Sequence, residues 1–204
     1  MRRRLVLPIG AAVLALAIAG CGGSSSGSSK AATSPSAAPS TTGPNPNGPE
    51  VSPSGDIPDN QAFVPYRGPG FVVSVPEGWA QSTTAAGVQF SDKLNSITAR
   101  SRQGGALTAA QARSTIVAKL AAARKGFVPG SVTVVRRKAG PAVRITYRAT
   151  GTTDPVTGKT PTDAVEQYVF VHNGKRLTLT LSGPKGADNV DPWRIVTDSV
   201  RWTP

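Results

Sequence analysis

The chain of 204 residues is poor in the side chains that several enzyme classes and metal sites require. It has one cysteine and one histidine, which allow neither an internal disulfide nor a typical zinc site. No serine stands in a Gly-x-Ser-x-Gly nucleophile elbow, and no glycine-rich segment has the spacing of a phosphate-binding loop. The composition alone is compatible with a catalytic Ser-His-Asp set. We nevertheless expect a chain without enzymatic activity and without a cofactor.

The N-terminus has the pattern of an export signal. Three arginines (Arg2–Arg4) precede an apolar run that ends at Ile18–Cys21. The run is shorter than the ~20 apolar residues of a membrane-spanning helix. Its end resembles the lipobox of bacterial lipoproteins, in which small residues precede a cysteine that is lipidated and becomes the new N-terminus. We therefore predict a signal peptide over 1–20 and a lipidated Cys21; the alternative is an ordinary secretory signal that happens to carry a cysteine.

Charge and composition divide the rest of the chain in two. Residues 21–60 contain one base and three acids, whereas the remainder contains 19 bases and 8 acids. The first part is rich in Ser, Gly, Pro and Thr and has almost no large apolar side chain. Such a segment cannot bury enough surface to offset its ordering entropy. We predict a disordered tether over 21–60 and one globular domain over 61–204.

Seven segments of this domain have the character of β-strands. The clearest are 164–172 and 175–182, because Asn173-Gly174 between them favours a two-residue hairpin turn. That register pairs Phe170 with Leu177, so one face of the hairpin is apolar and the other is polar and faces solvent. The polar face carries Gln167, Thr178 and Thr180. The other strands are predicted over 71–75, 87–91, 96–102, 131–138 and 142–150.

Two helices complete the predicted elements. After a capping box at Thr108, apolar residues recur at helical spacing over about four turns, and Gly126 is a candidate for the end. A short helix is predicted over 192–199, with Asp191 as its N-cap. The order of strands, helix, four strands and helix predicts an α+β domain. It would be an antiparallel sheet of six to seven strands covered by one long and one short helix.

Four segments resemble the PsbP-like fold: FVVSVPEGW from Phe71, PAVRITYRATG from Pro141, EQYVFVHNGKRLTLTLSGP from Glu166 and DPWRIVTDSVRW from Asp191. Many actinobacterial lipoproteins, the LpqN type among them, are similar. The resemblance covers about Phe63 to Pro204. Relatives with known roles are mainly non-enzymatic, so the resemblance implies a binding or accessory module and supplies no catalytic residue.

Basic side chains form the leading candidate site. Arg136, Arg137 and Lys138 end one predicted strand, and Arg144 and Arg148 share a face of the next. If the two strands form a hairpin, these five make a positive patch suited to anionic envelope polymers or lipid headgroups. The alternative is a solvated basic face that aids solubility. We expect no nucleic acid as a partner, because the chain is predicted to be exported and no aromatic residue is interleaved with the bases.

Weaker candidates lie elsewhere in the domain. His172 is next to the hairpin turn, where a turn role is favoured over a metal ligand or base. Glu166 faces the apolar side of its strand, where an ion pair with an arginine is favoured over catalysis. The acidic run 188–191 resembles a calcium cluster only faintly. The connection 151–163 is long for a hairpin, and such loops are often functional or disordered.

Together these patterns predict a lipoprotein on the extracytoplasmic face of the cell membrane, anchored through lipid on Cys21. Its domain is expected to bind an unknown partner protein or an envelope component. The alternative is binding of an anionic envelope polymer through the basic patch.

Replacing Cys21 with alanine removes the thiol that the predicted lipid modification requires. We expect the C21A protein to be released into the medium or to remain unprocessed, whereas the wild type stays with the membrane fraction. Cell fractionation and the intact mass of the purified protein measure the two results. An unmodified thiol on the native product, or a different first residue, would contradict this prediction.

Overall fold

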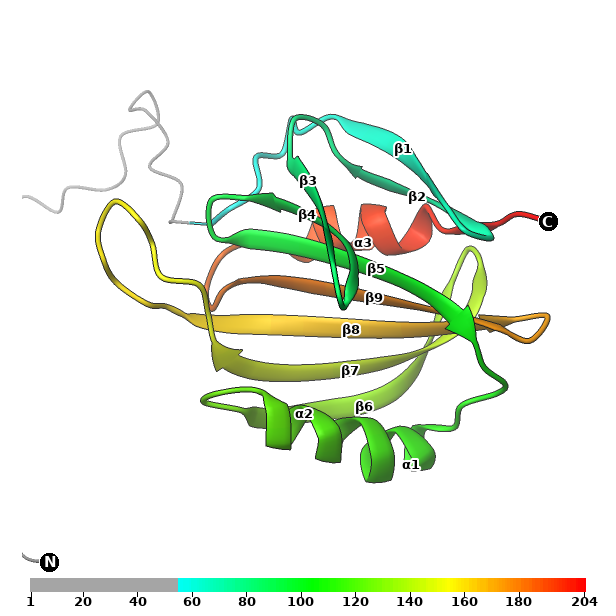
Figure 1. The fold of residues 1–204 in the computed structure, drawn as a ribbon. Helices are drawn as coiled ribbons and strands as arrows, with labels where there is room; N and C mark the ends of the chain where they lie inside the picture. Colours follow the sequence, from blue (N-terminus) through cyan, green and yellow to red (C-terminus); the bar gives the residue numbers. More distant parts are fainter. Residues whose placement is uncertain (1–54) are drawn as a thin grey trace, which may run out of the picture. The chain divides into compact units, whose positions relative to one another are not determined.

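A computed structural model describes residues 55–204, which form two β-sheets and two helical segments (Figure 1). The predicted signal peptide, Cys21 and most of the predicted tether lie outside the described residues. Within residues 55–204, no helix has the length and apolar character needed to cross a membrane. The described part of the chain is an α+β domain, as the order of predicted elements indicated.

The larger sheet has seven antiparallel strands in the order β3-β4-β5-β9-β8-β7-β6. Their bounds are Ala80–Thr84 (β3), Gly87–Asp92 (β4), Asn95–Gln103 (β5), Val128–Arg137 (β6), Gly140–Thr150 (β7), Thr162–His172 (β8) and Lys175–Pro184 (β9). Asn173 and Gly174 have φ values of 44° and 72°, the left-handed conformations that this hairpin turn requires. The predicted register is confirmed. It pairs Phe170 with Leu177, Tyr168 with Leu179 and Glu166 with Leu181.

A smaller sheet holds β1 (Phe63–Gly68), β2 (Phe71–Pro76) and β10 (Arg201–Trp202), with β2 in the centre. The sequence predicted β2 but not that it leaves the main sheet. Nearly every residue of β2 is buried, so its pattern carries no sign of which sheet it joins. β3 was missed because all five of its residues are exposed and no apolar alternation marks it.

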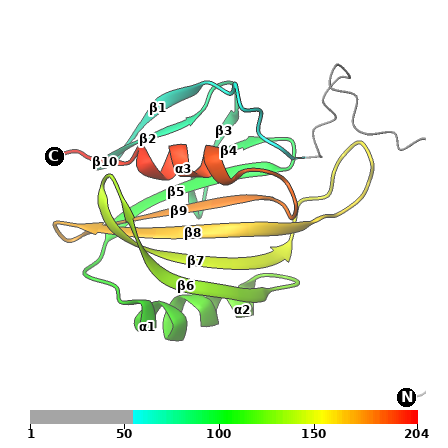
Figure 2. The ribbon, with the colours of Figure 1, turned by 180° about the vertical axis from the view of Figure 1, so that it is seen from behind.

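One face of the larger sheet packs against α3 (Val190–Asp198) and the smaller sheet, as Figure 2 shows from behind. The largest buried side chains of this core include Phe71, Tyr168, Phe170, Leu177, Leu179, Leu181, Trp193 and Val196. The predicted N-cap of α3 is wrong: Asn189 occupies that position. Asp191 lies in the first turn of the helix, where it pairs with Arg194 at 3.1 Å.

The side chain of Asn189 is buried and ties the start of the domain to its end. Its Oδ1 accepts the Ile57 N–H at 2.9 Å, and its Nδ2 donates to the Gly55 carbonyl at 3.1 Å and to Asn95 Oδ1 at 3.0 Å. Ile57 itself is part of the core. Gly55 to Ile57, which composition assigns to the tether, are therefore held on the domain. A single apolar side chain among polar ones forms no pattern that the sequence could reveal.

The other face of the larger sheet is covered by a helix with three consecutive parts. These are α1 (Ala109–Gln111), the π-helical segment η1 (Ala112–Val117) and α2 (Ala118–Ala123). The capping box is confirmed: the Gln111 N–H donates to Thr108 Oγ1 at 3.1 Å, and the Thr108 N–H donates to Gln111 Oε1 at 2.9 Å. The helix ends earlier than Gly126 indicated, because Arg124 is already extended.

The apolar side of this helix packs over only part of the sheet. Its buried partners on the sheet all belong to β6, β7 and β8. On β5 and β9, the side chains of the same face remain half-buried or exposed. An uncovered strip of sheet therefore runs beside the helix.

Replacing Asn189 tests how much its buried hydrogen bonds stabilise the domain. We expect Asn189→Ala to lower the free energy of unfolding by about 1–3 kcal/mol, because the truncation leaves buried polar groups unpaired. Urea unfolding measures the loss. The matched control is Asp188→Ala, which truncates an exposed neighbour. Equal stability of the two variants would show that the Asn189 bonds contribute nothing net.

Candidate functional site

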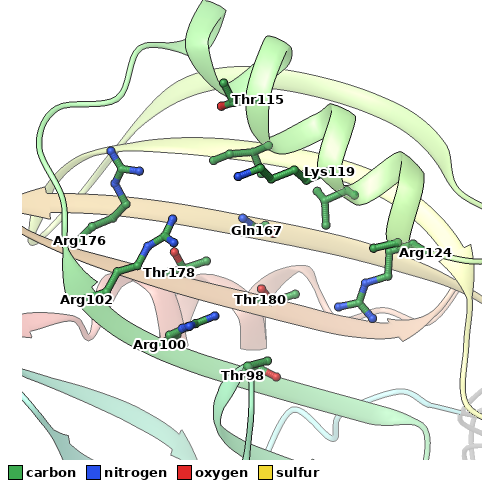
Figure 3. A pocket seen from close by; sticks show the side chains of 14 residues that line it. Thr98, Arg100, Arg102, Thr115, Lys119, Arg124, Gln167, Arg176, Thr178 and Thr180 are labelled. Atoms are coloured by element: carbon green, nitrogen blue, oxygen red, sulfur yellow. The ribbon is translucent and has the colours of Figure 1, made fainter.

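A groove of about 540 Å³ lies where the uncovered strip meets the helix (Figure 3). Strands β5, β8 and β9 form its floor, and η1 and α2 form its wall. Five basic side chains line it: Arg100, Arg102, Lys119, Arg124 and Arg176. We refer to it as the cationic groove. Its neutral polar lining is Thr98, Thr115, Gln167, Thr178 and Thr180.

Strand alternation places these side chains in the groove. On β5, Ile97 and Ala99 point into the core, so Thr98, Arg100 and Arg102 point to the opposite face. On β9 the leucines take the core side, which leaves the intervening threonines and Arg176 facing the groove. The π-helical segment contributes Thr115 and Ile116 to the wall. Segments of this kind are rare and often occur at functional sites.

The charge of the groove is not balanced by acids. Within residues 55–204, no acidic side chain lines the groove, and none of its five bases forms an ion pair. Arg176 Nη2 donates to the Gly105 carbonyl at 2.7 Å, and its buried Nε has no acceptor in the described part of the chain. A concave surface of one sign concentrates its field and attracts counter-ions. The groove is therefore suited to an anion.

A smaller polar cavity of about 200 Å³ continues from the groove and shares Thr98, Arg124 and Thr180 with it. Asp163 lines this cavity and is only 8% exposed. The Ser182 hydroxyl donates to Asp163 Oδ2 at 2.7 Å, while Oδ1 has no partner among the described residues. Burial raises the pKa of the Asp163 carboxyl, and the Ser182 hydrogen bond offsets part of that effect.

The basic residues predicted from sequence are divided between two faces. Arg137 and Arg144 lie on the α3 side of the sheet and bind other side chains of the domain. Arg137 donates to the Tyr168 hydroxyl at 3.0 Å and to Thr197 Oγ1 at 2.9 Å. Arg144 forms an ion pair with Glu166, as the preference for an ion pair at that residue predicted.

Tyr168 completes this internal network by donating to Glu166 Oε2 at 2.6 Å. Burial, together with Glu166, raises the pKa of Tyr168 to about 12. Arg136 points to the opposite face from its neighbour in β6, and it is exposed, as are Lys138 and Arg148. The five residues do not form one patch. Their role in binding polyanions remains a prediction.

The other candidates have ordinary structural surroundings. His172 lies beside the hairpin turn, with its ring stacked 5.4 Å from that of Trp202. No three side chains of His, Cys, Asp or Glu gather within residues 55–204. The connection 151–163 is held by its own bonds: Asp154 Oδ1 accepts the Val156 N–H at 2.8 Å, and the Asp154 N–H donates to the Lys159 carbonyl at 2.8 Å.

The cationic groove was not identified from sequence, although its parts were visible. The solvent-facing sides of three segments that are separate in the sequence carry the basic residues and threonines of the groove. Nothing in the sequence shows that the helix lies beside β9 and β5 rather than over them. That placement is a property of the packed sheet.

No family model and no curated protein matches the chain. Among solved structures, it is similar to PsbP (CyanoP) from the cyanobacterium Synechocystis sp. PCC 6803. The TM-score is 0.52 with 14% identity, over 79% of this chain and 100% of that one. At this identity the similarity shows the fold alone.

Two further solved structures are similar at lower scores. LpqN from Mycobacterium tuberculosis, described as involved in cell envelope biogenesis, has a TM-score of 0.45 and 16% identity, over 72% of this chain and 93% of that one. A protein of unknown function from Pseudomonas aeruginosa has a TM-score of 0.42 and 15% identity, over 70% and 98%. The PsbP-like fold implied by the sequence resemblance is confirmed through CyanoP.

The raised pKa of Asp163 has a consequence for stability. The folded state holds the proton to higher pH than the unfolded state, whose carboxyl titrates near about 3.9. The free energy of unfolding of the wild type is therefore expected to fall as pH rises from that value through the folded-state pKa. Asp163→Asn removes the titration and should be the more stable protein at neutral pH. Urea unfolding of both proteins from about pH 3 to about pH 7 measures the difference; parallel pH profiles would contradict it.

Proposed function

We propose that this chain is a membrane-anchored lipoprotein whose PsbP-like domain is a non-catalytic module that binds an anionic component of the cell envelope. The observation that carries the proposal is the cationic groove, with five bases and no acid among its described lining residues. Four of the five are arginines, whose planar guanidinium groups suit phosphate and carboxylate oxygens.

The shape of the groove favours a small ligand or one segment of a polymer over a partner protein. A volume of about 540 Å³ lies within the range of about 300–1,000 Å³ typical of small-molecule pockets. Protein interfaces are instead broad and, in their centres, depleted of charge. A protein partner would therefore have to place an acidic segment in the groove.

The predicted anchor determines which ligands the domain can meet. A diacylated Cys21 gives stable attachment, whereas one acyl chain binds membranes only marginally. The tether residues that precede Gly55, 21–54, would have a root-mean-square reach of roughly 30 Å, calculated as about 5–6 Å multiplied by the square root of the residue number. The domain would then be able to reach the outer surface of the cell membrane and the adjoining layer of the wall. Anionic lipids and wall polymers are the ligands proposed there.

The proposal is tested by removing equal charge from two surfaces. We expect the groove variant R100Q/R102Q/K119Q to bind a polyphosphate probe about tenfold or more weakly than the wild type, because the removed charges act at short range. The matched variant R136Q/K138Q/R148Q should keep most of the affinity. Wild-type binding should weaken steeply as salt rises, since exposed charges are screened.

Isothermal titration of the purified proteins at several salt concentrations measures these affinities. If only R136Q/K138Q/R148Q loses binding, the patch predicted from sequence is the site and the groove is not. Salt-insensitive binding, or no binding by the wild type, would overturn the proposal.

A further inference from the structure

The side chains on the floor of the cationic groove are arranged in a regular order along the strands. Strands β5 and β9 are paired so that four rows of side chains cross the uncovered strip. The rows are Ser96 with Ser182, Thr98 with Thr180, Arg100 with Thr178, and Arg102 with Arg176. Successive rows are about 7 Å apart along the strands. The rows change from hydroxyl groups at one end to guanidinium groups at the other.

Charge follows the same direction. Arg100, Arg102 and Arg176 gather at one end, and no acidic side chain lines that part of the groove within residues 55–204. Arg124 stands at the other end (Figure 3), where the adjoining cavity also contains Asp163. A ligand's anionic group is therefore favoured at the three-arginine end and repelled by any negative charge on Asp163 at the other.

Gln167 adds a neutral polar group to the floor in the middle of the groove, with Lys119 on the wall beside it (Figure 3). Gln167 lies opposite Thr180 and so extends the Thr98–Thr180 row onto β8. The residue as a whole is only 8% exposed, and its side-chain amide faces the groove. An amide offers both donors and an acceptor, as the flanking threonine hydroxyls do, and this is the set that a ligand hydroxyl uses.

We infer that the groove binds a phosphate ester of a polyol, with the phosphate at Arg100, Arg102 and Arg176 and the ligand hydroxyls at Thr98, Gln167 and Thr180. The inference rests on the proposed function and specifies its ligand class. A ligand that is anionic along its whole length would give the Gln167 carbonyl oxygen no donor. A neutral sugar would leave the three guanidinium groups unmatched.

Three probes separate the two halves of the ligand: inorganic phosphate, glucose and glucose 6-phosphate. We expect the purified protein to bind glucose 6-phosphate about tenfold or more tightly than inorganic phosphate, and glucose more weakly than either, because only the ester uses both ends of the groove. Titration followed by nuclear magnetic resonance measures weak affinities of this kind.

Variants assign each half to its residues. Arg102→Gln should weaken binding of phosphate and of glucose 6-phosphate alike. Thr98→Val and Gln167→Met should remove most of the advantage of glucose 6-phosphate while leaving phosphate binding unchanged. The matched control is Thr133→Val, which makes the same replacement at an exposed position of β6 on the other face of the sheet.

The outcomes distinguish this inference from the proposed function. If phosphate binds and the ester binds no tighter, or if Thr98→Val and Gln167→Met both behave like Thr133→Val, the polyol inference is wrong and the anion-binding function stands. If neither phosphate, glucose 6-phosphate nor polyphosphate binds, both fail. Glycerophosphoinositol, the deacylated headgroup of a lipid, supplies a further arm. Tighter binding of this diester than of glucose 6-phosphate supports a membrane headgroup as the source, and the reverse supports a free or wall-bound ester.

Discussion

The register between β8 and β9 is the constraint on which the rest of this domain depends. Leu177, Leu179 and Leu181 alternate along β9 with the polar residues of the groove floor. A slip of one residue would put the leucines in the groove and the polar residues in the core. The Asn173-Gly174 turn prevents this slip, because its two left-handed residues close the hairpin with a loop of fixed length. The same strand register therefore determines both the apolar core and the polar floor of the groove.

Much of this arrangement could be predicted because it is encoded locally. Asn173-Gly174 and the alternation of β9 fix a register, and Thr108 with Gln111 fixes a helix start. The elements that could not be predicted lack a local signal. β3 is exposed throughout, β2 is buried almost throughout, and the N-cap of α3 is decided by what Asn189 contacts far away in the chain. Composition likewise does not show that Ile57 is held in the core.

The basic residues illustrate the same limit at the level of function. Sequence spacing assigned Arg136, Arg137, Arg144 and Arg148 to strands, but it does not show which of them the fold uses internally. Arg144 is paired with Glu166, and Arg137 holds Tyr168 and Thr197. The arginines of the cationic groove, which have no acidic partner within residues 55–204, come from β5, β9 and the end of α2. Their proximity follows from where the helix stops covering the sheet, which is a tertiary property.

The buried hydrogen bonds of the Asn189 side chain also have a mechanical consequence. In a chain anchored as we propose, a pull between membrane and ligand enters the domain at Gly55 and Ile57. From there the Asn189 and Asn95 side chains pass the force to β5, which carries part of the groove floor. The helical wall of the groove stands outside this load path. Tension along the anchor would therefore reach the floor of the groove first, through these side chains.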